Sequence, residues 1–167
     1  MKFTIANIII GAYSIGMLAC TPNENSEPIL GNSPNEQYPQ NILFSEYLLD
    51  ETNCRWNVSS YDSEILCIND NKEFIKYILC EDTCNCPDID FENNTLIIIH
   101  GGCPNAIRHI RMGNFLLMSD GNDYKFNVEL ILDKVDFPEY WIKAIVTEKL
   151  RTIDKIELEV NTSFYTM

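Results

Sequence analysis

The segment at residues 124–132 alternates apolar and polar side chains without a break, a pattern typical of a β-strand with one buried face. Its apolar members are Tyr124, Phe126, Val128, Leu130 and Leu132. Successive side chains of a strand point to opposite faces of its sheet, so one face of this strand belongs in a core and the other in water. The turn-forming run at residues 120–123 precedes it. The chain must therefore build a sheet with at least one covered face.

Further segments of strand type lie on both sides of this one. Residues 95–100 form an unbroken apolar run rich in isoleucine, which predicts a strand covered on both faces. Residues 42–49 are apolar but too short to distinguish a strand from a helical turn. The other predicted strands are residues 55–58, 64–68, 107–112, 115–118, 141–147 and 156–160.

One helix is expected, over residues 71–80. Asp70 offers an N-cap oxygen and Glu73 follows three residues later, as in a capping box. The apolar residues that recur at helical spacing are Phe74, Ile75, Ile78 and Leu79. About seven short strands and one helix predict an α+β, β-rich fold. We expect an antiparallel sandwich or open barrel with the helix packed on one side.

The N-terminal end of the sequence has the features of an export signal. A lysine, Lys2, precedes an apolar run at residues 3–18, and Ala19 and Cys20 follow that run. A small residue followed by cysteine at this point is typical of a lipoprotein signal peptide; an uncleaved signal anchor is the alternative. We therefore expect a signal peptide at residues 1–19 and acyl chains such as palmitate on Cys20, because several chains hold a protein stably to a membrane.

A tether and one domain are expected after the signal. Residues 20–40 are rich in proline and asparagine, bury little apolar surface and predict a disordered tether. Residues 41–163 then form a single β-rich domain. The expected location is the cell envelope, lipid-anchored at the outer membrane, on either its periplasmic or its surface face.

The charge balance limits the partners of such a protein. The formal net charge is −13. A chain this acidic is repelled by phosphate backbones, so nucleic-acid binding is excluded. The expected partners are the membrane, reached through the N-terminal lipid, and an envelope protein.

The chain holds six cysteines besides Cys20. They are Cys54, Cys67, Cys80, Cys84, Cys86 and Cys103. An oxidising compartment favours disulfides for such cysteines. A zinc site with His100 as a further ligand is one alternative, but its spacing fits poorly, because Cys84 and Cys86 are too close in sequence to chelate comfortably. A redox-active Cys84/Cys86 pair is another. We expect no metal and no cofactor.

The histidines and paired carboxylates give no catalytic motif. His100 ends a strand of buried type, where a histidine bonded to a backbone carbonyl is expected, and His109 reads as a solvent-facing strand residue. Asp88 and Asp90 alternate around an isoleucine and are expected to cap a turn, with calcium binding or acid–base work as the alternative. We therefore expect no catalytic residues.

Three aromatic residues suggest a surface on which a sugar can stack. Trp56 and Trp141 are explained by core packing, whereas Tyr140, next to Trp141, is explained by it less well. Ligand stacking therefore stays an alternative to core packing for this group.

The sequence resembles a group of small, uncharacterised exported lipoproteins of gut anaerobes. The motifs that carry this resemblance are Cys54-Arg55-Trp56, Glu73-Phe74, Tyr77-Ile78-Leu79-Cys80, Pro87-Asp88-Ile89-Asp90-Phe91 and Tyr140-Trp141-Ile142-Lys143-Ala144-Ile145. More distantly, part of the same order resembles the C-terminal domain of a protease-complex lipoprotein, one that is accessory to a surface protease. This chain has Pro104-Asn105-Ala106-Ile107 where that group often has Gly-Gly-Tyr.

The resemblance implies a disulfide pairing. It suggests Cys54 and Cys80 as partners, tying the first strand to the end of the helix, because both lie inside its motifs. We expect a second bridge from Cys103 to either Cys84 or Cys86, and Cys67 reduced in the core.

The expected function is a non-catalytic binding or accessory role on a lipid anchor. One alternative is a thiol-redox protein that uses Cys84 and Cys86. The other is a regulator of a surface protease, which only the distant resemblance implies.

Overall fold

The structure, a computed structural model, describes residues 37–58, 60–81, 85–119, 123–150 and 156–166. The chain divides into residues 1–35 and a compact unit from Glu36 to Met167, and the description concerns the second. The predicted signal peptide, the lipid site at Cys20, most of the predicted tether and Cys84 lie outside the described residues.

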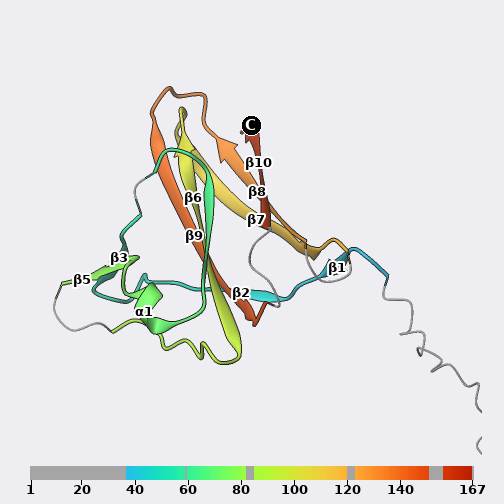
Figure 1. The fold of residues 1–167 in the computed structure, drawn as a ribbon. Helices are drawn as coiled ribbons and strands as arrows, with labels where there is room; N and C mark the ends of the chain where they lie inside the picture. The colour runs from blue at the N-terminus through green and yellow to red at the C-terminus, as the bar shows by residue number, and fades with distance from the viewer. Residues whose placement is uncertain (1–36, 59, 82–84, 120–122, 151–155, 167) are drawn as a thin grey trace, which may run out of the picture. The chain divides into compact units, whose positions relative to one another are not determined.

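The described residues form a β-rich unit with two four-stranded sheets and one two-stranded sheet (Figure 1). The first sheet has the order β1 (Gln40–Asn41), β7 (Ile107–Leu117), β8 (Tyr124–Leu132) and β10 (Ile156–Phe164). The second has the order β2 (Phe44–Glu46), β9 (Glu139–Glu148), β6 (Asn94–Cys103) and β4 (Glu64–Ile68). The small sheet pairs β3 (Cys54–Trp56) with β5 (Ile78–Cys80).

A shared core joins the two larger sheets into a sandwich. Phe126 and Val128 of β8 pack in one cluster with Ile97 and Ile99 of β6, and all four side chains are fully or almost fully buried. The alternation that predicted β8 is present in its burial, since every second residue from Tyr124 to Leu132 is buried. The predicted β-rich fold class is thus confirmed, in its sandwich form.

A second core covers the outer face of the second sheet. Leu96 and Ile98 of β6 face this side and pack with Phe74 and Ile78, from the short helix and the small sheet. The central strand is therefore covered on both faces, as its unbroken apolar run predicted.

The predicted helix is much shorter than expected. Helix α1 covers Asn71–Phe74, and its cap is the expected one, because Asp70 accepts a hydrogen bond from the Glu73 backbone N–H at 2.7 Å. The second half of the predicted helix is strand β5 instead, with Ile78 opposite Trp56. A helix of about ten residues is marginal by itself, so pairing with a distant strand overrides its local preference.

Three further details differ from prediction. The two strands expected at residues 107–112 and 115–118 are one strand, β7, with an irregularity between Met112 and Phe115. Strand β10 runs parallel to β8, whereas an all-antiparallel arrangement was expected. The domain begins before residue 41, because Gln40 pairs with Leu117 and Tyr38 packs against the main core.

Candidate functional site

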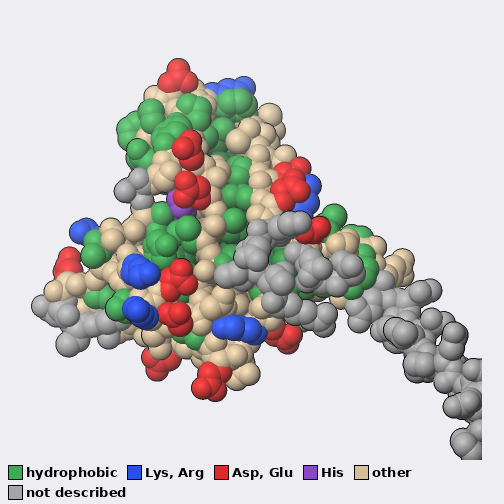
Figure 2. Space-filling view, viewed as in Figure 1, with side chains coloured by type: hydrophobic (Ala, Val, Ile, Leu, Met, Phe, Trp, Pro, Cys, Tyr) green, Lys and Arg blue, Asp and Glu red, His purple; other side chains and the backbone are tan. Residues whose placement is uncertain are grey.

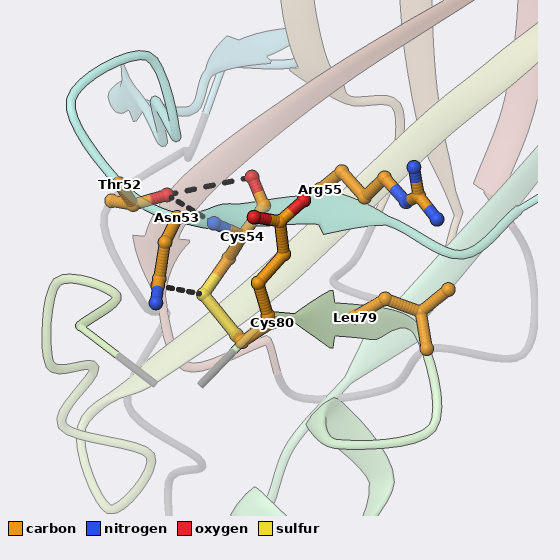
Figure 3. Close-up of a pocket in the computed structure, with 7 residues that line it drawn as sticks. Thr52, Asn53, Cys54, Arg55, Leu79 and Cys80 are labelled. Carbon is orange, nitrogen blue, oxygen red and sulfur yellow. Dashed lines mark hydrogen bonds between the residues drawn. A yellow bond between two sulfur atoms is a disulfide. The ribbon is translucent and has the colours of Figure 1, made fainter. Parts of the chain in front are cut away.

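The small sheet brings two cysteines together. Cys54 and Cys80 lie directly opposite each other in the β3–β5 ladder and form a disulfide. This is the pair that the resemblance favoured, although Cys80 lies on a strand and not at a helix end. Figure 3 shows the disulfide at the ends of the two strands, with the side chains of Arg55 and Leu79 extending away from it.

A third cysteine lies beside this bond. The Sγ atoms of Cys80 and Cys86 are 3.8 Å apart, and those of Cys54, Cys80 and Cys86 all lie within 4.8 Å of one another. The disulfide borders a surface hollow of about 480 Å³. A cysteine binds a metal ion as its thiolate, so with Cys54 and Cys80 bonded to each other this cluster does not offer three thiolate ligands.

Two other cysteines are thiols in the sandwich. Cys67 on β4 is half-buried, and burial, with a smaller contribution from Glu73, raises the pKa of its thiol to about 12. This agrees with the prediction that Cys67 stays reduced. The prediction that Cys103 bridges to Cys84 or Cys86 is wrong, because Cys103 is a buried thiol in the core between the sheets. Cys86 packs on the other face of the second sheet, so the sheet separates the two sulfurs.

His100 is buried in the second sheet and lies 3.7 Å from Glu64, measured from Nε2 to Oε2. Burial lowers the pKa of His100, while Glu64 and the Ser60 backbone act in the opposite direction. Sequence analysis predicted a hydrogen bond between this ring and a backbone carbonyl. Neither ring nitrogen makes a hydrogen bond of good geometry to a described residue, so that bond is not seen. A neutral, buried imidazole is consistent with a structural position. His109 is exposed on β7, as predicted.

Asp90 caps a turn, as predicted. Its carboxylate accepts hydrogen bonds from the side chain of Asn93 at 2.7 Å and from the Glu92 backbone N–H at 3.1 Å. The bond from Asn93 is the main reason that the pKa of Asp90 is lowered. Its neighbour Asp88 is exposed. Asp90 therefore stabilises the local turn, whereas no such contact is shown for Asp88.

The three aromatic candidates separate into core and surface. Trp141 is buried between the sheets, and Trp56 packs against Tyr47 and Phe74 on the outer face of the second sheet. Tyr140 is 64% exposed and meets Tyr61 edge-to-face, with ring centroids 5.7 Å apart. We call Tyr61 and Tyr140 the aromatic pair.

Tyr61 is not among the candidates predicted from the sequence; it precedes β4 and lies between the predicted strands at residues 55–58 and 64–68. A signal was present in Gly102, which stands opposite Tyr140 in the β6–β9 ladder. A glycine in a strand often marks a place where another group approaches the backbone closely. Here that group is the ring of Tyr61, since a Cβ atom on Gly102 would overlap its Cδ2.

No helix in the described part of the chain is long and apolar enough to cross a membrane. No protein-family model matches the sequence, and no curated protein and no solved structure is similar enough to match it.

Proposed function

We propose that this chain is a lipid-anchored envelope protein with a non-catalytic binding or accessory role. The observation that supports the binding role is the exposure of the aromatic pair on the outer face of the second sheet. Val135 and Phe137, in the loop before β9, are also more than half exposed. Figure 2 shows hydrophobic side chains gathered at the upper end of the molecule. Exposed apolar groups that cluster in this way mark interaction sites.

The aromatic pair is held in place before any partner binds. The backbone N–H of Gly102 donates a hydrogen bond to the Tyr61 carbonyl at 2.8 Å, and the Tyr61 ring lies against Gly102. A tyrosine offers a rigid apolar ring and a polar hydroxyl, which suits recognition at a wet surface. A preorganised pair loses little entropy on binding.

A photo-cross-linking experiment tests this function. Benzoylphenylalanine placed at Phe137, three residues before Tyr140, is expected to form an adduct with an envelope component in intact cells. Tyr61→Ser combined with Tyr140→Ser is expected to abolish that adduct. The same cross-linker at Phe164, an exposed position on β10, is the control and is expected to form no such adduct. An adduct that survives the double substitution, or none with the wild-type surface, would remove the support for a binding role.

The anchor and the location belong to the same proposal. The lipid on Cys20 and the outer-membrane location are supported by the sequence pattern at residues 1–20. An anchored binding domain of this kind would reach its partner at the membrane surface.

Thiol chemistry is a second candidate, favoured by the Cys80–Cys86 sulfur distance of 3.8 Å. In such an exchange a thiolate forms a bond to Cys80 Sγ while the Cys54–Cys80 bond breaks and Cys54 leaves as a thiolate. Sequence analysis predicted Cys84 and Cys86 as the redox pair, and Cys84 lies outside the described residues. Incubation with reduced glutathione tests this candidate, because a redox function requires a mixed disulfide at Cys54 or Cys80 in the folded protein.

The role of protease regulator is supported only by the distant resemblance. It is a special case of the accessory role, and co-purification of the membrane form with a surface protease is its test.

A further inference from the structure

His100 on β6 is a buried side chain whose polar atoms are not satisfied. It lies on the outer face of the second sheet with Ile98 and Gly102, because alternate residues of a strand point the same way. The side chain is 2% exposed, and neither ring nitrogen makes a hydrogen bond of good geometry to a described residue. A positive charge on a ring so far from water costs more than the neutral form. The closed structure therefore favours the neutral imidazole.

A loop at residues 60–63 covers this ring. Figure 1 shows the segment before β4 crossing the upper part of β6. The Ser60 backbone interacts with the ring, and Glu64, the first residue of β4, stands opposite His100 in the ladder. The Glu64 side chain is 50% exposed, and residues 61–63 are exposed as well. Opening of this loop would therefore bring water to the buried imidazole.

The same loop carries half of the aromatic pair. The Gly102 N–H donates a hydrogen bond to the Tyr61 carbonyl at 2.8 Å, and the Tyr61 ring lies against Gly102. Gly102 comes two residues after His100, on the same face of β6. Release of the loop would therefore expose His100 and separate Tyr61 from Tyr140 in one movement.

The charged groups around His100 do little to offset its burial. The Glu64 carboxylate lies 3.7 Å from Nε2, but it is half exposed and its attraction is screened by water. On β9 the residue opposite His100 is the apolar Ile142. Tyr61 and Tyr140 stay neutral in acid, since tyrosine ionises at about pH 10. The other charged groups on the loop, next to Ile142 and in the hollow that Ile142 lines are Asp62, Lys143, Glu46, Asp50 and Arg55. This set has both signs of charge and so favours neither form of the ring strongly.

Protonation in acid therefore works against the closed loop. Burial lowers the pKa of His100 below its ordinary value of 6.5, so an opened loop binds the proton more readily than a closed one. The closed loop is fully stable above pH 6.5 and loses stability as the pH falls below 6.5, because the open state is protonated first. A loop can open alone at a lower free-energy cost than the whole domain.

We propose that His100 is an acid-sensitive switch of the aromatic pair: a proton taken up from water by the ring releases the loop at residues 60–63 and moves Tyr61 away from Tyr140. This inference rests on the proposed binding function, whose site it regulates. A partner bound across Tyr61 and Tyr140 would be held at neutral pH and released in mild acid.

Amide hydrogen exchange, followed by NMR on the full chain purified in detergent, tests the switch without any partner. The protection factor of the Gly102 amide reports the opening of its bond to Tyr61. We expect it to fall at least about threefold between pH 7.5 and pH 5.0, and at most about 30-fold, the limit for a proton bound in the open state alone. The Val128 amide, in β8 between β7 and β10, should keep its protection over the same range.

His100→Gln removes the titrating ring and is expected to make the Gly102 protection factor equal at the two pH values. The other histidine of the chain, His109, is exposed on β7, so His109→Gln is the matched control and should keep the wild-type pH dependence. An NMR titration of the wild type needs no variant to fold. In it the His100 ring should titrate below pH 6.5, in step with the loss of Gly102 protection.

A wild-type Gly102 protection factor that is equal at both pH values would overturn the inference. So would an equal fall at Val128, because acid would then unfold the whole domain, or a fall that persists in His100→Gln. These outcomes do not touch the cross-linking result at Phe137, so the switch can fail while the binding function stands. Absence of the cross-linked adduct with the Gly102 response intact would instead remove the binding function and leave the acid-driven opening of the loop.

Discussion

Tyr61 and Gly102 are joined twice, by a hydrogen bond of 2.8 Å from the Gly102 N–H to the Tyr61 carbonyl and by the ring of Tyr61, which lies where a Cβ of residue 102 would be. The loop that carries Tyr61 is thereby fixed to β6, the central strand of its sheet. The position of one half of the aromatic pair depends on the absence of a side chain at residue 102.

Gly102→Ala is therefore expected to displace the Tyr61 ring and to lower the free energy of unfolding by about 1–3 kcal/mol, the usual cost of overpacking. Denaturant unfolding measures the loss. In a Tyr61→Ala background the same substitution should cost much less, since the ring is no longer there. Equal costs in both backgrounds would show that the ring does not rest on Gly102.

The Cys54–Cys80 bond closes a loop whose ends are 26 residues apart. Replacement of both cysteines by serine is expected to lower the free energy of unfolding by about 3 kcal/mol, because the unfolded chain gains the entropy of the opened loop. Non-reducing peptide mapping checks the connectivity. A Cys54–Cys67 linkage would refute the pairing and make the segment from Cys54 to Ile68 the linked unit.

The strands that sequence predicted well are those whose signal is local. The alternation along β8 predicts one buried face, and the apolar run in β6 predicts two. The structure confirms both predictions. The Asp70 cap is also local, because it involves only the Glu73 N–H three residues away.

The features that sequence missed depend on partners far along the chain. Strand β5 forms because Trp56 and Cys54 lie opposite Ile78 and Cys80, and nothing in residues 71–80 alone reveals them. The bridge predicted for Cys103 was wrong because the sequence does not show on which side of a sheet a sulfur lies. The same holds for the candidate site. Tyr140 could be predicted from its neighbour in sequence, whereas Tyr61, which completes the aromatic pair, lies on a loop far away in the sequence and was missed.

Cys67 is expected to make the folded protein less stable at alkaline pH. Its pKa in the folded protein is about 12, above the ordinary value of 9.0, so the folded state favours the neutral thiol. Stability contributed by this group is fully present below about pH 9 and is lost as the pH rises towards 12, because the unfolded chain ionises first. Cys67→Ala should flatten the decline in stability between pH 8.5 and pH 10.5. Iodoacetamide should label Cys67 slowly at pH 8 in the folded protein, since the thiolate is the reactive form. Fast labelling without unfolding would contradict the raised pKa.

The N-terminal boundary of the domain can be located by deletion. Removal of residues 21–36 is expected to leave the thermal midpoint unchanged, because their composition offers little surface to bury. Removal of residues 21–41 should lower it, since it takes away strand β1 and the packing of Tyr38 on the main core. Differential scanning calorimetry distinguishes the two deletions, and equal midpoints would mean that β1 adds no stability.

The lipid anchor is tested at Cys20. In Cys20→Ser no thiol is available for acylation, so the protein is expected either to leave the membrane or to persist as an uncleaved precursor of higher mass. Separation of membranes from the soluble fraction, followed by intact-mass measurement, distinguishes these outcomes. Cys67→Ser is the matched control, because it also removes one thiol but should leave processing and membrane retention unchanged. Wild-type mass and retention in Cys20→Ser would refute the anchor. The binding role argued from the aromatic pair would then stand without it, because the two proposals rest on different residues.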